Sequence, residues 1–151
     1  MKAANILETI GRTPHIRINR LFGEAGDDQV HGNLGEDTCE GGEGADIVRG
    51  GQQDDLVFGG AGDDFLAGDR DADTISGGAG ADIFHTHGAA GLDRVLDFNL
   101  AEGDRVQLLP GTSYAVTQVG ADTVISMTGG GQMVLVGVAA NALTPGWIFG
   151  D

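Results

Sequence analysis

Apolar side chains recur at every ninth position through the first half of the chain. The series is Val30, Cys39, Val48, Val57, Leu66, Ile75 and Phe84. Between these positions the chain consists mostly of glycine and polar residues. A period that holds through seven copies predicts a stack of repeated units whose apolar positions share one core.

Each repeat also carries a glycine and an aspartate at fixed places. With the glycine as motif position 1, the glycines are Gly23, Gly32, Gly41, Gly50, Gly59, Gly68 and Gly77. The aspartates stand at position 6 and are Asp28, Asp37, Asp46, Asp55, Asp64, Asp73 and Asp82. The apolar residue stands at position 8. A glycine-rich linker would not keep a carboxylate and a core-type residue in register through seven copies.

The spacing predicts one turn and one short strand in each repeat. Glycine is frequent at positions 1, 2 and 4, where a tight turn requires positive φ, and positions 7 to 9 suit a strand of about three residues. Two repeats then make one coil, and successive coils stack about 4.8 Å apart. The sequence therefore predicts an all-β fold, a parallel β-roll (β-solenoid) with the position 8 side chains inside.

Stacking brings the position 6 aspartates into two ladders, one on each edge of the roll. Odd repeats supply Asp28, Asp46, Asp64 and Asp82, and even repeats supply Asp37, Asp55 and Asp73. Carboxylates about 5 Å apart repel each other, so a cation between them is expected. Carboxylates and turn carbonyls suit Ca²⁺ better than Mg²⁺ or Zn²⁺. The alternative, a solvated acidic face, does not require the same place in every copy.

Charge is concentrated in the same segment. Between Phe22 and Phe84 there are 16 Asp and Glu against two Arg, Arg49 and Arg70, which gives −14 of the chain's net −15. Cations are therefore the natural partners, and nucleic acid, whose phosphates would be repelled, is excluded.

Three repeats match the pattern GGxGxDxUx at every place: Glu40–Val48, Phe58–Leu66 and Ser76–Phe84. This pattern resembles the RTX (hemolysin-type) family of calcium-binding nonapeptide repeats, which form a right-handed parallel β-roll. The resemblance implies that each ion lies between turns one coil apart, held by position 6 aspartates and turn carbonyls. It implies five ions, between the pairs Asp28 and Asp46, Asp46 and Asp64, Asp64 and Asp82, Asp37 and Asp55, and Asp55 and Asp73. The implied carbonyls belong to the glycines of positions 2 and 4, namely Gly26, Gly35, Gly42, Gly44, Gly51, Gly60, Gly62, Gly78 and Gly80.

Some repeats depart from the pattern. Gln53 and Asp71 replace the glycine of position 4 and must accept a strained backbone. Position 2 is Glu24, Asn33 and Asp69 in the first, second and sixth repeats, the last of which also contains Asp71. After Phe84 the period slips by two residues, yet Gly88, Gly91, Asp93 and Val95 reproduce positions 1, 4, 6 and 8. An eighth turn is expected there, and a sixth ion if Asp93 closes a site with Asp73.

Beyond Asp93 the pattern changes to alternating or apolar runs separated by turn residues. The predicted strands are Arg94–Phe98, Arg105–Leu109, Tyr114–Val119, Thr123–Met127 and Met133–Val138. They are expected to cap the open edge of the roll as antiparallel strands. Residues 93–98 and 102–108 resemble the C-terminal half of RTX modules in serralysin-type proteases and mannuronan epimerases. That resemblance implies that residues 147–151 are read by a type I secretion apparatus, whereas packing of Trp147 and Phe149 on the cap is the alternative.

The first residues have a different character. Residues 3–21 resemble the N-terminus of cysteine synthase, a pyridoxal-phosphate enzyme, but the only lysine available for a Schiff base is Lys2. We expect a short helix over Ala3–Ile10 and an extended strand near Leu21, which falls at position 8 of an incomplete copy. The predicted organisation is a leader at 1–21, the roll at 22–95 and the cap at 96–151.

Other chemistry finds little support. The sequence contains no run of about 18 apolar residues, the length that a membrane-spanning helix requires. Cys39 occupies an inward position, which favours packing over a reactive thiol. His85 and His87 could share one strand face, but two histidines without a third ligand seldom bind zinc. Zinc-protease, lipase and nucleotide-binding motifs are absent from the sequence.

The leading hypothesis is a non-enzymatic calcium-binding module. It would stay loose in the bacterial cell, leave by type I secretion, and fold on Ca²⁺ outside as part of a secreted, extracellular protein. A polysaccharide-binding module of a carbohydrate-active enzyme is the second hypothesis. A remnant of cysteine synthase is the third.

Overall fold

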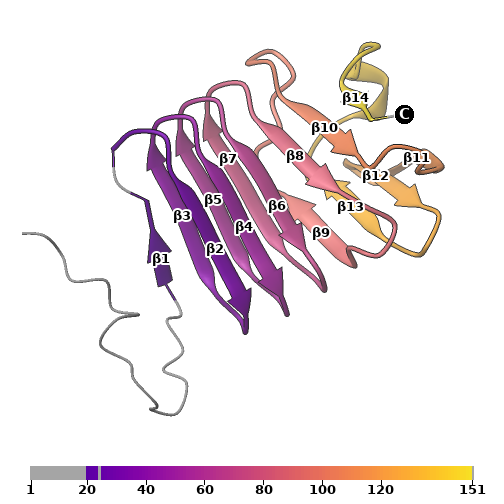
Figure 1. The fold of residues 1–151 in the computed structure, drawn as a ribbon. Coiled ribbons are helices and arrows are strands. Elements are labelled where there is room, and N and C mark those ends of the chain that lie inside the picture. Colours follow the sequence, from indigo (N-terminus) through magenta and orange to yellow (C-terminus); the bar gives the residue numbers. More distant parts are fainter. Residues whose placement is uncertain (1–19, 24, 151) are drawn as a thin grey trace, which may run out of the picture.

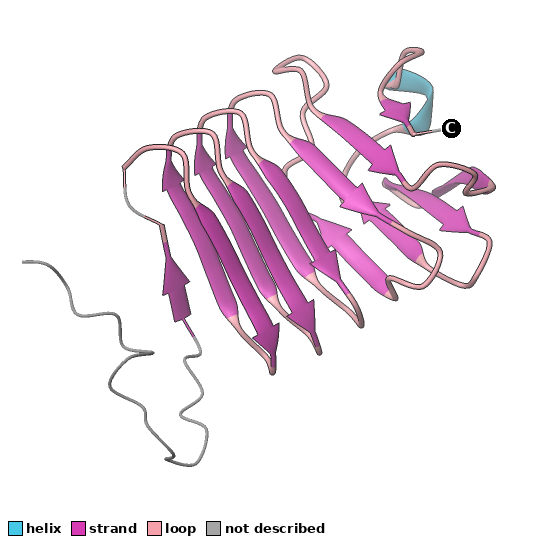
Figure 2. Cartoon of the chain, in the orientation of Figure 1, coloured by secondary structure: helices cyan, strands magenta, loops and turns pink. Residues whose placement is uncertain are grey.

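The chain folds as two stacked β-sheets that wind around one narrow core. This is seen in a computed structural model that describes residues 20–23 and 25–150 (Figures 1 and 2). The first sheet has the order β1-β3-β5-β7-β9-β13-β12-β11, and the second has the order β14-β10-β8-β6-β4-β2. Odd and even strands of the repeats therefore lie in different sheets. The predicted all-β class and parallel β-roll are confirmed.

The strands of the first sheet are β1 (Arg20–Phe22), β3 (Thr38–Glu43), β5 (Leu56–Ala61), β7 (Thr74–Ala79), β9 (Leu92–Val95), β11 (Tyr114–Val119), β12 (Asp122–Met127) and β13 (Gln132–Leu135). Those of the second are β2 (Gln29–Leu34), β4 (Ile47–Gln52), β6 (Phe65–Asp69), β8 (Ile83–Thr86), β10 (Arg105–Leu108) and β14 (Ile148–Phe149). One 3₁₀ turn, η1 (Ala140–Ala142), precedes β14. Most repeat strands are longer than expected, because pairing continues beyond motif position 9 into positions 1 to 3 of the next copy.

A constant register stacks the repeats, with each strand paired to the strand two nonapeptides further along the chain. Cys39 pairs with Val57 and Val57 with Ile75 in one sheet, while Val30 pairs with Val48 in the other. Parallel strands in this register place the position 8 side chains in one file per sheet. From Cys39 to Phe84 the position 8 side chains are fully buried, and Val30 is nearly so. The core is therefore one side chain wide at each strand.

Four of the described non-glycine residues hold left-handed backbone, and strain was predicted from the sequence for two of them, Gln53 and Asp71. Gln53 and Asp71 have φ of 77° and 76°, and Asn33 and Asp69 have 73° and 79°. Asp71 compensates in part, because its Oδ2 accepts the Gln53 N–H at 3.0 Å. Because Asn33, Gln53, Asp69 and Asp71 all belong to even repeats, the second ladder carries the more strained turns.

The register lengthens toward the C-terminus. Ile75 pairs with Val95 rather than with Asp93, which confirms the predicted slip of two. Phe84 pairs with Val106, where the constant register would have required Glu102. The same two sheets thus run on into the cap without a break.

The cap is only partly antiparallel, which corrects the expected all-antiparallel arrangement. β10, β13 and β14 pair in parallel with β8, β9 and β10, and only β11–β12–β13 form an antiparallel meander. β11 has the predicted bounds, whereas the other predicted cap strands begin or end earlier in the chain than expected. The bounds of these cap strands are set by the strands with which they pair and not by the alternation of apolar and polar residues in their own sequences.

Both described ends of the chain join the roll. Leu21 of β1 pairs with Cys39, as the incomplete copy predicted; the rest of the cysteine-synthase-like leader, with its expected helix, lies outside the described residues. Trp147 is 8% exposed and its ring meets Phe98 edge-on at 6.2 Å. Among the described residues, none of the helical segments is both long and apolar enough to cross a bilayer.

Candidate calcium-binding turns

The position 6 aspartates form two continuous ladders of hydrogen bonds. In each rung the carboxylate Oδ1 accepts the backbone N–H of the aspartate one coil earlier: Asp46 from Asp28, Asp64 from Asp46 and Asp55 from Asp37, each at 2.8 Å. Asp73 accepts from Asp55 at 2.8 Å, and Asp82 from Asp64 at 3.0 Å. The structure therefore brings together, coil to coil, all five aspartate pairs that the sequence suggested.

The second oxygen of these carboxylates is buried without a hydrogen-bond partner. This holds for Oδ2 of Asp46, Asp55, Asp64, Asp73 and Asp82, whose residues are at most 2% exposed. An ionised oxygen left in this state is strongly unfavourable unless a cation or a proton meets it. A row of such atoms at equivalent places marks positions that require a cation or a proton.

The position 1 glycines line the same spaces. A Cβ added to Gly41 would lie 2.4 Å from Asp46 Oδ2 and 2.6 Å from the carbonyl oxygen of Gly59 one coil on. Equivalent oxygens lie near the Cβ positions of Gly23, Gly32, Gly50 and Gly59. In each case they are the Oδ2 of the aspartate in the same repeat and the carbonyl oxygen of the position 1 glycine one coil on. Five places therefore combine a carboxylate oxygen with a carbonyl oxygen, and they coincide with the five aspartate pairs.

Side chains alone would not complete a coordination shell. Within the described residues, no group of three or more His, Cys, Asp or Glu side chains is arranged to hold a metal ion. Two carboxylates plus several backbone carbonyls is a donor set for a hard cation of flexible geometry, which describes Ca²⁺. The residues present thus fit calcium better than a transition metal.

Filling one of these spaces is a direct test. Gly59→Ala places a methyl group against Asp64 Oδ2 at 2.4 Å and the Gly77 carbonyl oxygen at 2.5 Å. We expect a loss of about 1 to 3 kcal/mol in the folding free energy with calcium, by overpacking, and a weaker calcium titration. Gly111→Ala is the control, because Gly111 has φ 82° but no atom within 4 Å of its Cβ position. A calcium titration of Gly59→Ala equal to that of the wild-type chain would contradict the placement.

Burial raises the pKa of several ladder carboxyls. The pKa is about 6 for Asp55 and for Asp82, about 8 for Asp73 and about 7 for Asp93, against an ordinary 3.8. Desolvation is the main cause in each, and neighbouring carboxylates add to it for Asp55, Asp73 and Asp82. Without a cation, Asp73 and Asp93 take up protons near neutral pH, and Asp55 and Asp82 do so only as the pH falls to about 6.

This predicts an inverted pH dependence for the metal-free protein. Because the folded pKa values lie above 3.8, the folded state binds more protons than the unfolded state between about pH 4 and pH 8. The metal-free roll should therefore gain stability as pH falls from 8 to about 4, while calcium affinity falls over the same interval. Circular dichroism in EDTA at pH 8, 6 and 4.5 measures the first effect, and a β signal that does not grow toward acid would contradict it.

The eighth turn is present. Asp73 and Asp93 face each other in register, since Thr74 pairs with Arg94. Asp93 is fully buried, its Oδ2 accepts the Thr86 hydroxyl at 3.3 Å, and its Oδ1 has no partner. The three atoms nearest to a Cβ built on Gly68, however, all belong to Asp73. The carbonyl oxygen of the next coil is not one of them. A sixth ion at this pair stays a prediction.

The first ladder has a further rung that the sequence pattern did not identify. Asp104 lies one coil beyond Asp82 and accepts its N–H at 2.9 Å through Oδ1. Its Oδ2 accepts the Asn99 N–H at 2.8 Å, so both oxygens are occupied. The signal was available, because Asp104-Arg105-Val106 repeats the spacing of positions 6 to 8. The preceding turn, 99–103, lacks the glycine pattern of the repeats. Asp104 therefore ends the ladder and adds no further pair of carboxylate and carbonyl oxygens.

Asp97 is a second residue missed at this end. Its carboxylate accepts the Ser76 hydroxyl at 2.6 Å and the N–H groups of Gly77 and Gly78 at 2.9 and 3.0 Å. In earlier repeats an equivalent N–H group donates to the backbone of the next coil, as Gly23 does to the Glu40 carbonyl oxygen. Asp97 therefore links the cap to Ser76–Gly78, where the turn of the seventh repeat begins.

Cysteine and histidine play other parts. Burial raises the pKa of the Cys39 thiol to about 12, in keeping with its packing position. The rings of His85 and His87 lie 6.4 Å apart, and His85 stacks on Phe65 at 5.6 Å. Burial, and next the charge of Arg49, lowers the pKa of His85.

Comparison with known proteins gives several matches to this chain. In solved structures the chain resembles the AlgE6R3 subunit of Azotobacter vinelandii mannuronan C5-epimerase, with 29% identity over 84% of this chain and 80% of that one and a TM-score of 0.47. The AlgE6R2 subunit of the same enzyme gives 25% identity over 86% and 91%, with a TM-score of 0.44. The extracellular lipase LipA of Serratia marcescens gives 17% identity over 93% of this chain and 41% of the lipase, with a TM-score of 0.42. A sequence search of curated proteins found no match.

Stacked glycine turns with buried aspartate ladders define a repeat β-roll of the cation-binding class. Within that class, residues 17–91 match the model of the RTX calcium-binding nonapeptide repeat in four copies, at 17–48, 40–75, 49–84 and 58–91. This segment of the chain belongs to the RTX calcium-binding repeats.

Proposed function

We propose that the chain is a non-enzymatic calcium-binding module that folds when Ca²⁺ enters the turns of its roll. Five ions are proposed, one for each aspartate pair of the two ladders. The observation that carries the proposal is the row of buried carboxylate oxygens without hydrogen-bond partners. A divalent ion at each pair would satisfy them and supply +10 against the −14 of this segment.

Metal binding and folding should be one process. Without cations the carboxylates repel each other or take up protons, and a core one side chain wide cannot offset the loss of chain entropy. Low calcium inside a bacterium would then keep the chain loose, and millimolar calcium outside would fold it. Secretion through a type I apparatus, in a bacterial extracellular protein, is the setting that we propose for this switch.

Calcium stoichiometry tests the proposal. Isothermal titration of metal-free protein should give about five ions per chain, and a crystal grown in calcium should show anomalous peaks between consecutive turns of both ladders. Binding of one ion or none would contradict it. Absence of the pyridoxal chromophore would remove the cysteine-synthase hypothesis.

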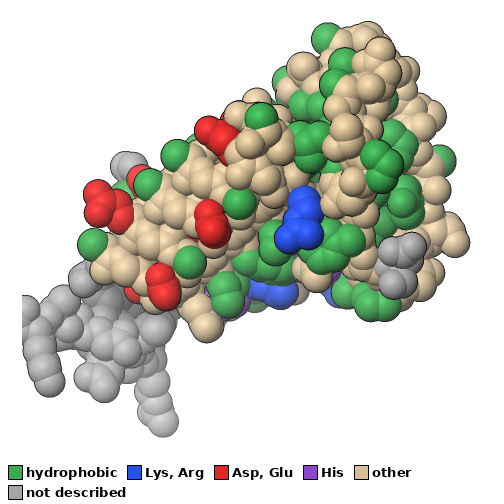
Figure 3. All heavy atoms as spheres, turned by 90° about the horizontal axis from the view of Figure 1, so that it is seen from above, with side chains coloured by type: hydrophobic (Ala, Val, Ile, Leu, Met, Phe, Trp, Pro, Cys, Tyr) green, Lys and Arg blue, Asp and Glu red, His purple; other side chains and the backbone are tan. Residues whose placement is uncertain are grey.

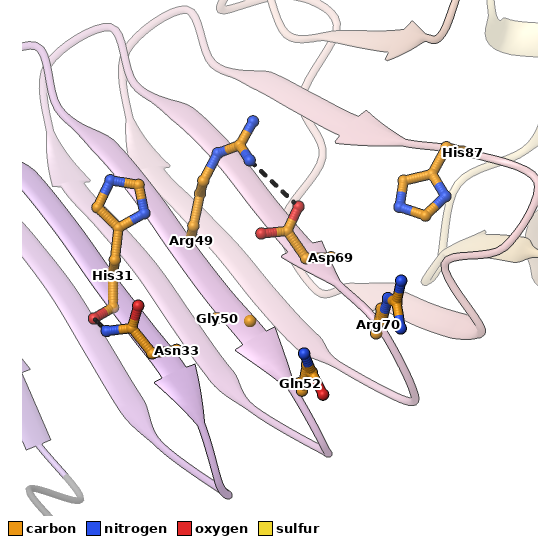
Figure 4. Close-up of a pocket in the computed structure, with 9 residues that line it drawn as sticks. His31, Asn33, Arg49, Gly50, Gln52, Asp69, Arg70 and His87 are labelled. Carbon is orange, nitrogen blue, oxygen red and sulfur yellow. Dashed lines mark hydrogen bonds and ion pairs between the residues drawn. The ribbon is translucent and has the colours of Figure 1, made fainter.

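A groove on the second sheet supports polysaccharide binding as a second candidate function. It has a volume of about 400 Å³ and is lined by residues that include His31, Arg49, Asp69, Arg70 and His87 (Figure 4). Arg49 and Arg70 are the two cations of the acidic segment, and Arg49 pairs with Asp69 at 3.6 Å. A groove of mixed polar and cationic side chains suits hydroxyl and carboxylate groups of a sugar chain. Loss of polymer binding in Arg70→Gln, with calcium titration unchanged, would favour this candidate; equal binding would oppose it.

A further inference from the structure

The cap ends in an open strand with no charge. β11 is the terminal strand of the first sheet, at the opposite end from β1 (Figure 1). All six of its side chains are exposed, including Tyr114 at 42% and Val119 at 59%. It contains no charged residue, no proline and no glycine. Charge, proline and bulges are the usual means by which proteins prevent edge pairing, and β11 contains no charge and no proline that would prevent pairing with another strand.

The hydrogen-bonding groups of β11 alternate between its two sides. The Ser113 carbonyl accepts the Thr128 N–H at 2.9 Å, just before the strand pairing of Tyr114 with Met127. In an antiparallel pair, bonded and non-bonded residues alternate, so Ala115 and Thr117 bond to β12. The N–H and C=O groups of Tyr114, Val116 and Gln118 then point to the open side.

Charge decides what could pair there. From Val106 to Gly150 the only charged residue is Asp122, and its Oδ1 accepts the Gly137 N–H at 2.7 Å. The acidic side chains gather instead over the roll, while apolar side chains predominate over the cap (Figure 3). Two copies that meet through their caps keep their segments of −14 far apart, whereas contact through the rolls would bring like charges together.

We propose that β11 is the interface for a second copy of this chain, joined antiparallel through the open edge. The strands centre on Val116, which lies opposite Val116 of the second copy, with Tyr114 opposite Gln118. This register pairs the outward groups of one copy with those of the other. Because the same strand of both copies forms the contact, it is two-fold symmetric and closes at a dimer.

Molecular mass in calcium tests the proposal. Light scattering or sedimentation equilibrium over micromolar to millimolar protein should show twice the 15.4 kDa chain mass. Val116→Lys sets two lysines opposite each other and should raise the dimer dissociation constant about tenfold or more. Leu34→Lys is the matched control, because Leu34 is an exposed apolar residue at 67% on β2, far from the cap, and its dimer should be unchanged.

Amide exchange gives a second measurement that does not depend on the variants. The Val116 N–H should be protected only at dimer concentrations, while the Thr117 N–H, bonded to β12, should be protected in both states. A wild-type chain that stays at monomer mass throughout overturns the proposal, and so does a Val116→Lys variant that dimerises like wild type. Circular dichroism in calcium reports folding separately, so failure of the calcium hypothesis is distinguishable from failure of this one.

Discussion

Removing calcium with excess EDTA is expected to unfold the roll and abolish most of its β signal in circular dichroism. Five ladder aspartates, Asp46, Asp55, Asp64, Asp73 and Asp82, are buried and their Oδ2 atoms have no hydrogen-bond partner, so loss of the ions leaves stacked carboxylates exposed to one another's charge. The core provides little resistance, because each strand contributes a single buried position 8 side chain. Trp147, packed on Phe98, should lose its near-ultraviolet signal with the roll if the cap depends on it.

Magnesium at the same concentration is the control for ionic strength. It demands a tighter octahedral shell and releases water reluctantly, so it should not restore the signal. Identical spectra in EDTA and in millimolar CaCl₂ would show that metal does not drive folding.

The second large effect is expected for Asp64→Asn, at the centre of the first ladder. Asp64 belongs to two aspartate pairs: its Oδ1 accepts from Asp46, and its own N–H donates to Asp82 Oδ1. The asparagine can keep the Oδ1 bond but puts an N–H₂ donor where the unpartnered Oδ2 faced the turn carbonyls. Two of the five proposed ions lose an anionic ligand. We expect the calcium concentration at the folding midpoint to rise about tenfold or more.

Asp63→Asn removes the same charge one residue away. Asp63 is exposed and its Oδ1 accepts the Ala81 N–H at 2.9 Å, a bond that asparagine can keep. Its calcium midpoint should stay close to wild type. If both variants shift the midpoint equally, the effect is one of net charge and the ladder residues have no special role.

The sequence period was enough to place the ladders because the length of two nonapeptides determines which aspartates become neighbours. It also located the strained residues Gln53 and Asp71, whose side chains stand where a turn requires positive φ. Both results depend on local geometry repeated without change, so no knowledge of distant contacts was needed.

The end of the roll could not be derived in this way. Asp104 joins the ladder above Asp82, and Asp97 reaches back to Ser76, because extra residues in the turns change the coil length there. β13 pairs in parallel with β9, although β10, β11 and β12 lie between them in the sequence. The alternation of apolar and polar residues in Gln132–Leu135 does not indicate which strand β13 pairs with. Where the period stops, long-range pairing decides the structure.

The alternation of repeats between the two sheets sets a rule for how such a chain can change in length. Loss of two consecutive repeats, such as residues 40–57, would leave every later strand in its own sheet and would bring Asp28 beside Asp64, its equivalent one coil on. Loss of a single repeat would transfer every later strand to the opposite sheet and mismatch both ladders with the cap. The unit of viable insertion or deletion is therefore the pair of nonapeptides, much as the codon is the unit of a reading frame.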